Sequence, residues 1–403
     1  MKYTVLLSFL LSFSGQYSTA CSSVIISGKA TRDGRPLMWK NCDTDNLNHS
    51  LIYSDDKGLP LLGIVRNSSA DEATASIWTG TNAKGFSIMN TLSYNLTENR
   101  VTSSNGWVMR RALEVCGNVP DFKAFLDTLP KPLQVESNYG VIDAEGNAAY
   151  FETYPDGYRM IDVNDPATAP LGYLVYTNFS YTGFYDKGEG YIRYQTVMHQ
   201  MVKQAPSKNF TPQWIFNKLA RCFYHSLMDA DFTDESTMAS FKNGYIPDAD
   251  FIPRNSTASS TVVQGVRKGE NPELTTMWTV LGYTPCSIAI PSWVKAGRDN
   301  APLLMRGGEN YTSQMCNRAL ELKATVFDVS RGHGQSYLRF SKLHNREGTG
   351  YMQQLAPVEN EVFGMAAPWI DKWRQADSVD KAEVVELAAE ISRFVDENFI
   401  INQ

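Results

Sequence analysis

The first 21 residues constrain this protein most, because they indicate where the folded chain begins. Met1-Lys2 gives a short positive start, and an apolar run of eleven residues over 3–13 follows it. This run is shorter than the roughly 18 residues of a membrane-spanning helix. The next residues are small and polar up to Ala20, which is the pattern of a secretory signal peptide. We therefore expect residues 1–20 to be cleaved off, with Cys21 as the new N-terminus.

The remainder, 21–403, has the composition of one large folded domain, which we expect to be exported to the periplasm or the extracellular space. Of the 403 residues, 43% are hydrophobic and 20% are charged, which is an ordinary globular balance. Lys and Arg number 37 against 43 Asp and Glu, and the net charge of -6 disfavours a nucleic-acid-binding surface. No internal repeat or clear linker divides the chain, so we expect a single domain.

The pattern of apolar residues and turns predicts antiparallel strand pairs followed by helices. Strands are expected over 22–27, 36–41, 75–78, 85–91, 138–142, 148–154, 158–163, 276–281 and 287–290. Helices are expected over 107–116, 119–129, 190–204, 212–224 and 381–399. Asp33-Gly34, between the first two strands, is typical of a hairpin turn. These elements favour one α+β domain of stacked layers with a C-terminal helix.

A free N-terminal cysteine would combine two catalytic groups in one residue. Its thiol is a nucleophile, and its α-amine, with an ordinary pKa of about 7.7–8.0, can act as general base. The amine would need a carboxylate to orient it, and a nearby cation would favour the thiolate. Acyl transfer also needs hydrogen-bond donors for the tetrahedral oxyanion. A cysteine at position 21 therefore needs no separate histidine as its base.

The residues around Cys21 resemble the opening of a known superfamily. Cys21 and the apolar strand after it are followed by Asp33-Gly34 and then by Lys40-Asn41-Cys42-Asp43. This order resembles the N-terminal-nucleophile cysteine hydrolases, which show a leading Cys, a hairpin of the Asp-Gly type and Arg-Asn-x-Asp. The superfamily includes choloylglycine hydrolases, penicillin V acylases, acid-ceramidase-like amidases, isopenicillin-N acyltransferase-like proteins and secreted dipeptidases.

Three later segments resemble the same superfamily in the same order. The segment 82–86 with Asn90 after it resembles the strand that carries an oxyanion asparagine. Thr177-Asn178 resembles the segment with a second active-site asparagine, and Gly190 to Arg193 resembles a helix start with a late arginine. The resemblance implies a four-layer αββα sandwich of antiparallel sheets. The site residues it implies are Cys21, Lys40, Asp43, Asn90, Asn178 and Arg193.

The resemblance also implies a role for each site residue in acyl transfer to the thiol. Asn90 and a backbone amide would stabilise the oxyanion, and Asn178 would hold the α-amine or the substrate. Asp43 would orient the amine, while Arg193 and Lys40 would supply positive potential. Lys40 stands where the superfamily usually has Arg, so the charge is kept but the bidentate fork is lost.

One geometric condition follows from the spacing of these residues. Lys40 and Asp43 point to opposite faces of a regular strand. Both can reach Cys21 only if the strand ends or bulges near Cys42.

Four of the site residues also have simpler interpretations. Asp43 could be a turn residue, Asn90 a solvated strand residue, and Arg193 a surface partner of Glu189. Asn178 lies in an Asn-Phe-Ser sequon, so it could carry a glycan, which would exclude a catalytic role.

We expect an exported cysteine amidohydrolase that cleaves linear non-protein C–N amides of the acyl-amide, conjugated bile acid or N-acyl amino acid type. The alternatives are a secreted dipeptidase of the same class and a non-catalytic binding protein lipid-anchored through Cys21, the one case in which we expect membrane contact. Ser18 argues against the anchor, because a lipoprotein signal usually has Leu at that position. The sequence has no Cys-x-x-Cys or His-Glu-x-x-His pattern and no nucleotide-binding fingerprint, so we expect no metal and no cofactor.

The six cysteines cannot all pair within the chain if Cys21 is the nucleophile. Cys42 is then a candidate for the unpaired one. The other four allow three connectivities, and they are Cys116, Cys222, Cys286 and Cys316.

Overall fold

The computed structural model describes residues 20–67, 72–98, 104–307 and 311–401. The predicted signal peptide, apart from Ala20, lies outside the described residues. Within them, no helix combines the length and the apolar character needed to cross a membrane.

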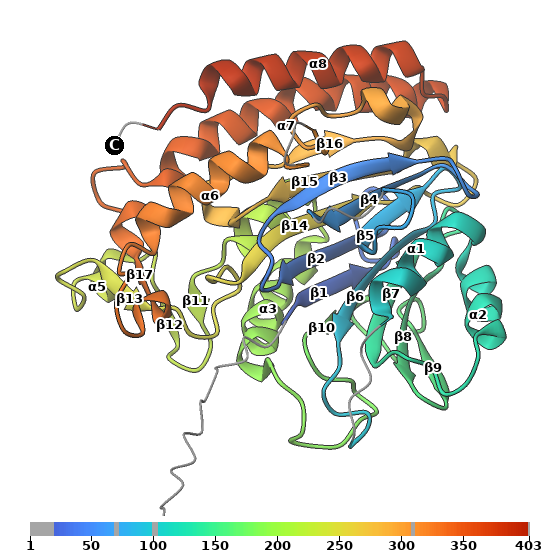
Figure 1. Cartoon of the computed structure of the whole chain (residues 1–403), viewed down its shortest axis with the longest axis horizontal. Helices are drawn as coiled ribbons and strands as arrows, with labels where there is room; N and C mark the ends of the chain where they lie inside the picture. The colour runs from blue at the N-terminus through green and yellow to red at the C-terminus, as the bar shows by residue number, and fades with distance from the viewer. Residues whose placement is uncertain (1–19, 68–71, 99–103, 308–310, 402–403) are drawn as a thin grey trace, which may run out of the picture.

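Two antiparallel sheets form the centre of the molecule (Figure 1). The first sheet has six strands in the order β10 (Tyr173–Tyr176), β1 (Ser22–Ile26), β2 (Leu37–Asp43), β14 (Thr257–Gln264), β15 (Thr276–Leu281) and β16 (Ile290–Ser292). The second sheet is a seven-stranded meander of β3 (His49–Ser54), β4 (Leu61–Arg66), β5 (Ile77–Asn82), β6 (Ser87–Leu92), β7 (Ser137–Ile142), β8 (Ala148–Tyr154) and β9 (Gly157–Asp162). The first sheet is assembled from distant segments, whereas the second follows the chain order.

The two sheets pack face to face, and helices cover their outer faces (Figure 1). β1 and β2 contact β6, β7 and β8 across the interface. The second sheet is covered by α1 (Asn105–Val115) and α2 (Val119–Thr128), and the first by α3 (Tyr191–Gln204), α6 (Gln314–Val326), α7 (Tyr351–Ala376) and α8 (Lys381–Asn398). This arrangement is the predicted four-layer αββα sandwich, and it follows because each sheet has two apolar faces to bury.

Small elements complete the described chain. They are α4 (Pro212–Ile215), α5 (Glu235–Met238), and the short strand pairs β11 (Tyr224–His225) with β12 (Ala230–Asp231) and β13 (Tyr245–Pro247) with β17 (Tyr337–Arg339).

Aromatic packing fixes the outer helices on the sheets. Phe122 of α2 lies against Phe86, Tyr139 and Phe151 of the second sheet, with ring centroids 5.0–6.0 Å apart. The contacts with Tyr139 and Phe151 are edge-to-face, and such contacts add about 0.5–1.5 kcal/mol each to the free energy of unfolding beyond the area they bury.

Three predicted elements differ in the structure, and one of them is the strand expected over 75–78, which is β5 at Ile77–Asn82. The helix expected over 212–224 stops as α4 at Ile215 and continues only as a π-helical turn, because Arg221 turns inward to a buried ion pair with Glu359. The strand expected over 287–290 is instead β16, three residues later, since a 3-10 turn occupies 284–286 just before it.

Candidate active site

β1 and β2 place Cys21 at the start of a central strand. Their antiparallel register pairs Ser22 with Asn41 and Ser23 with Lys40, and the next pair in this register is Cys21 with Cys42. Residues opposite each other in such a pair share a face of the sheet. The side chains of Cys21 and Cys42 therefore lie on one face together with Lys40.

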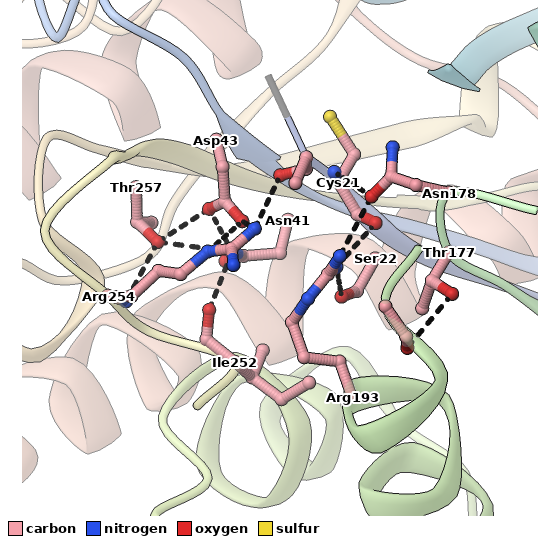
Figure 2. A network of polar contacts seen from close by, with 12 residues as sticks. Cys21, Ser22, Asn41, Asp43, Thr177, Asn178, Arg193, Ile252, Arg254 and Thr257 are labelled. Atoms are coloured by element: carbon pink, nitrogen blue, oxygen red, sulfur yellow. Dashed lines mark hydrogen bonds and ion pairs between the residues drawn. The ribbon is translucent and has the colours of Figure 1, made fainter. Parts of the chain in front are cut away.

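Cys21 is 6% exposed, and polar groups surround its backbone (Figure 2). Its nitrogen donates to Oδ1 of Asn178 at 3.1 Å. Arg193 donates from Nη2 to the same Oδ1 at 2.8 Å, and from Nη1 to the Cys21 carbonyl oxygen at 2.8 Å and to Oγ of Ser22 at 2.9 Å. Figure 2 shows the Cys21 sulfur pointing away from the Arg193 guanidinium. The predicted Asn178 and Arg193 thus act on the backbone of Cys21 rather than on its sulfur.

The burial of Asn178 and Arg193 decides two of the simpler interpretations. Asn178 is fully buried, and its Nδ2 donates to the Leu92 carbonyl oxygen at 3.0 Å, so its side chain has no room for a glycan in the folded chain. Arg193 is 1% exposed and turns inward from α3, so it is not a surface partner of Glu189.

The nitrogen of Cys21 is still joined to Ala20 in this chain. The Ala20 carbonyl oxygen accepts from Nη2 of Arg254 at 3.4 Å. Cleavage of this peptide bond would turn the nitrogen into an amine that still faces Asn178.

A cation and a thiol flank the sulfur of Cys21. The pKa of Cys21 is lowered to about 6, first by a hydrogen bond from the Cys42 thiol and then by the positive charge of Lys40, against the opposing effect of burial. The backbone N–H of Asp43 also donates to this sulfur. The same coupling raises the pKa of Cys42 well above its ordinary value, so Cys21 is the thiol that ionises.

Lys40 and Asn90 form one buried unit between the two sheets. Nζ of Lys40 donates to Oδ1 of Asn90 at 2.8 Å and to the Trp78 carbonyl oxygen at 2.9 Å. Nδ2 of Asn90 donates to Oγ of Ser137 at 2.9 Å. Asn90 is 2% exposed, so it is not a solvated strand residue. The pair joins β2 to β6 directly behind the Cys21 sulfur.

Asp43 lies on the opposite face of β2, as its spacing from Lys40 predicts. Its Oδ2 pairs with Nε and Nη2 of Arg254 at 2.9 and 2.8 Å, and its Oδ1 accepts from Thr257 at 2.7 Å and Asn41 at 3.0 Å. These contacts reach the Cys21 nitrogen only indirectly, since Arg254 also binds the Ala20 carbonyl (Figure 2).

Because the Asp43 side chain does not reach Cys21, β2 needs no irregularity, and the bulge near Cys42 lies in the neighbouring strand β14. Asp43 pairs with Thr257 and Cys42 with Ser259, which leaves Ala258 of β14 as an extra residue. Such a bulge re-aims side chains next to it. It brings Thr257 to the Asp43 carboxylate.

Sequence reasoning missed Arg254. This residue is 211 positions from Asp43 and belongs to no segment of the resemblance, so only the pairing of β2 with β14 brings the two together. A buried carboxylate such as Asp43 requires a cation, but nothing in the sequence indicates which of the many Arg and Lys residues supplies it.

A cavity of about 570 Å³ adjoins the backbone side of Cys21. Its lining includes Ala20, Arg193, Arg254, Asp248 and Asp250. Burial raises the pKa of Asp248 to about 8. The volume is in the range of small-molecule sites, and the lining offers both charges to a polar ligand. Among the described residues, no cluster of three or more His, Cys, Asp or Glu side chains is arranged to hold a metal ion.

Two facing antiparallel sheets between helical layers, with a thiol at the start of a central strand, define the N-terminal-nucleophile class of amide-cleaving and acyl-transferring enzymes. Residues 30–238, just over half of the chain, match the model of the family described as acyl-coenzyme A:6-aminopenicillanic acid acyl-transferase. The chain belongs to this family, which confirms the resemblance of its sequence to the class.

Three solved structures are similar to this chain at low identity. A mutant of conjugated bile acid hydrolase from Clostridium perfringens is 11% identical, with a TM-score of 0.39, and covers 65% of this chain and 89% of its own. The Caenorhabditis elegans ortholog of N-acylethanolamine-hydrolyzing acid amidase is 16% identical, with a TM-score of 0.38 and coverages of 62% and 93%. Penicillin V acylase from Agrobacterium tumefaciens is 11% identical, with a TM-score of 0.34 and coverages of 69% and 92%. No curated protein matches the chain.

Proposed function

We propose that this protein is an exported cysteine amidohydrolase that cleaves a linear, non-protein amide through a thioester on Cys21. The observation that carries the proposal is the position of Cys21, whose nitrogen is held by Asn178 and whose thiol has a lowered pKa. Export rests on the leader over residues 1–20, which the fold does not need because β1 begins at Ser22.

The proposed reaction begins after cleavage behind Ala20. The Cys21 thiolate attacks the amide carbonyl, and the second N–H of the Asn90 amide and a backbone N–H stabilise the oxyanion. The C–N bond breaks, the substrate nitrogen leaves with the proton held by the α-amine, and a thioester remains on the sulfur. The α-amine, held by Asn178, then takes a proton from water, and the hydroxide releases the acid and regenerates the thiol.

The charged side chains divide into two groups in this proposal. Lys40 stabilises the thiolate from the sulfur side. Arg193 fixes Asn178 and the Cys21 carbonyl oxygen, so it positions the amine without contacting the sulfur. The Asp43–Arg254 pair lies beside the bond behind Ala20 and binds the Ala20 carbonyl oxygen, a contact that ends when this bond is cleaved.

A dipeptidase of the same class is the second candidate. It is favoured by Asp248 and Asp250 in the cavity beside Cys21, because two acidic side chains there could bind the ammonium group of a dipeptide, with Asp248 as a carboxylate only above its raised pKa of about 8. The lipid-anchored alternative is disfavoured because β1 begins at Ser22, which leaves no tether between a lipid on Cys21 and the sheet.

A panel of amides scored by amine release tests the proposal. It should contain N-acyl amino acids, conjugated bile acids, β-lactam side-chain amides and dipeptides. Replacement of Cys21 by Ser is expected to lower turnover of the best substrate by at least about 100-fold. Cys116→Ser is the matched control, because this buried thiol packs between α1 and the second sheet, in a separate core from Cys21. Unchanged turnover in Cys21→Ser would rule out the mechanism, and dipeptides as the best substrates would favour the second candidate.

A further inference from the structure

We propose that Cys21 and Cys42 form a reversible disulfide, which makes the nucleophile a redox-controlled modification site. The proposed reaction uses Cys21 and leaves Cys42 without a chemical step. The control of amidase activity by this disulfide rests on the proposed function, but the formation of the disulfide does not.

The strand register, continued by one pair, places the two residues opposite each other. Ser22 pairs with Asn41, and the next pair outward is Cys21 with Cys42. Directly opposite residues of an antiparallel pair have Cα atoms about 4.5–5.5 Å apart, with side chains on the same face. Disulfides need a Cα separation of roughly 4.4–6.8 Å. A bond between these two sulfurs therefore requires rotation of side chains and no movement of strands.

The two thiols influence each other's ionisation. A hydrogen bond with the Cys42 thiol is the first cause that lowers the pKa of Cys21, and both side chains are nearly buried, with 6% and 5% exposure. Because Cys42 follows in the register opposite Cys21, on the same face of the sheet, it is placed to attack the oxidised sulfur.

Cys21 differs from the other cysteines in its ionisation. Burial raises the pKa of Cys116 and of Cys222 to about 12, and that of Cys316 to about 11, and it raises that of Cys286 further. Peroxides react with thiolates and not with buried neutral thiols. Oxidation is therefore expected at Cys21 first.

The chemistry balances with a peroxide as the oxidant. The Cys21 thiolate attacks hydrogen peroxide, forms a sulfenic acid and releases hydroxide. The Cys42 thiol then displaces the sulfenic hydroxyl as water, and the sulfur–sulfur bond forms with the loss of two electrons from the pair. A dithiol reverses the step by thiol–disulfide exchange. While the bond exists, Cys21 has no thiolate to attack an amide, and its sulfur is protected from irreversible sulfinic acid formation.

The test measures the bond by mass and the activity separately. Protein that begins at Cys21 is treated with hydrogen peroxide, alkylated, and digested without reductant. We expect a cross-linked peptide containing Cys21 and Cys42, 2 Da lighter than the two thiol peptides, that disappears on treatment with dithiothreitol. Amidase activity should be lost and recovered in parallel.

Cys42→Ser is the informative variant, because serine keeps the size of the side chain and cannot form the bond. In this variant, peroxide should drive Cys21 to the sulfinic acid, 32 Da heavier, and dithiothreitol should not reverse it. Cys222→Ser is the control and should behave as the unmodified protein.

A sulfinic Cys21 without the cross-link in the unmodified protein would overturn the inference, whatever the activity. A cross-link in a protein that hydrolyses no amide would support the inference and count against the proposed function alone.

Discussion

The buried pair of Asp43 and Arg254 gives a quantitative prediction. The Asp43 carboxylate is fully buried, and the Arg254 side chain is 17% exposed. Removal of one partner from a buried pair leaves an uncompensated charge and costs roughly 3–5 kcal/mol. Arg254→Met should fall at the lower end, at about 3 kcal/mol, because Thr257 and Asn41 still donate to Asp43.

Asp43→Asn should destabilise less, by about 2 kcal/mol, since the partly exposed guanidinium can recover water. The double variant leaves no buried charge unpaired. We therefore expect it to cost about 3 kcal/mol in place of the additive sum of about 5, which is a coupling of about 2 kcal/mol.

Urea unfolding at pH 7 of the unmodified protein, the two single variants and the double variant measures this double-mutant cycle. The exposed pair of Lys123 and Asp127, with both side chains more than half exposed, serves as control and should show a coupling below about 0.5 kcal/mol. Free energies for Asp43 and Arg254 that add within about 0.5 kcal/mol would refute the view that these residues act as one unit.

Three further predictions concern pH and catalysis. Alkylation of Cys21 by iodoacetamide should titrate with a midpoint near pH 6, and Lys40→Met should raise the midpoint; a midpoint above 8 in the unmodified protein would contradict the assigned environment. Burial lowers the pKa of His49 to about 3, so between pH 6.5 and 3 only the unfolded state binds this proton, and stability falls with the pH. The free energy of unfolding, measured with urea, should fall between pH 7 and pH 4 by about 3 kcal/mol less in His49→Gln than in the unmodified protein. An equal fall in both proteins would contradict the buried, neutral state of His49. Asn178→Leu should lower kcat by about 100-fold with a smaller change in KM, because the Cys21 nitrogen loses its acceptor; an effect on KM alone would assign Asn178 to substrate binding.

Local pattern predicted most of the second sheet and its helices. β6, β7, β8 and β9 differ from their expected ranges by two residues at most, because short turns that the sequence marks clearly separate them. β5 was expected too early, and β3 and β4 were not predicted. The opposite orientation of Lys40 and Asp43 also followed from the two-residue period of a strand.

In two of the missed elements, β14 and α7, tertiary contacts override local preference. β14 has the polar sequence TASSTVVQ, yet it is buried at the centre of the first sheet, where its hydroxyls bond to Trp39, His49 and Asp43. α7 contains Pro357 and Pro368, which interrupt a helical pattern and cost stability in a helix interior. The helix persists because it packs on the first sheet, for example through the stacked rings of Phe363 and Trp278.

The sequence predicted only part of the candidate site, because some of its contacts depend on residues far apart in the chain. Motif order pointed to Asn178 and Arg193, which the structure brings to the backbone of Cys21. The direct contact expected between Asp43 and the amine is absent from the described residues, where Asp43 pairs with Arg254 and Arg254 binds the Ala20 carbonyl oxygen. The long-range pairing that supplies Arg254 has no counterpart in a local pattern.

Mass spectrometry of the protein recovered outside the producing cell tests the central claim most directly. The mass is measured once for the protein alone and once after acid has stopped its reaction with an amide substrate. We expect a chain that begins with an unmodified Cys21 and gains the mass of the acyl group on its first peptide in the quenched sample. A chain that retains residues 1–20, or one that carries a diacylglycerol on Cys21, would contradict the assignment of this residue as both nucleophile and base.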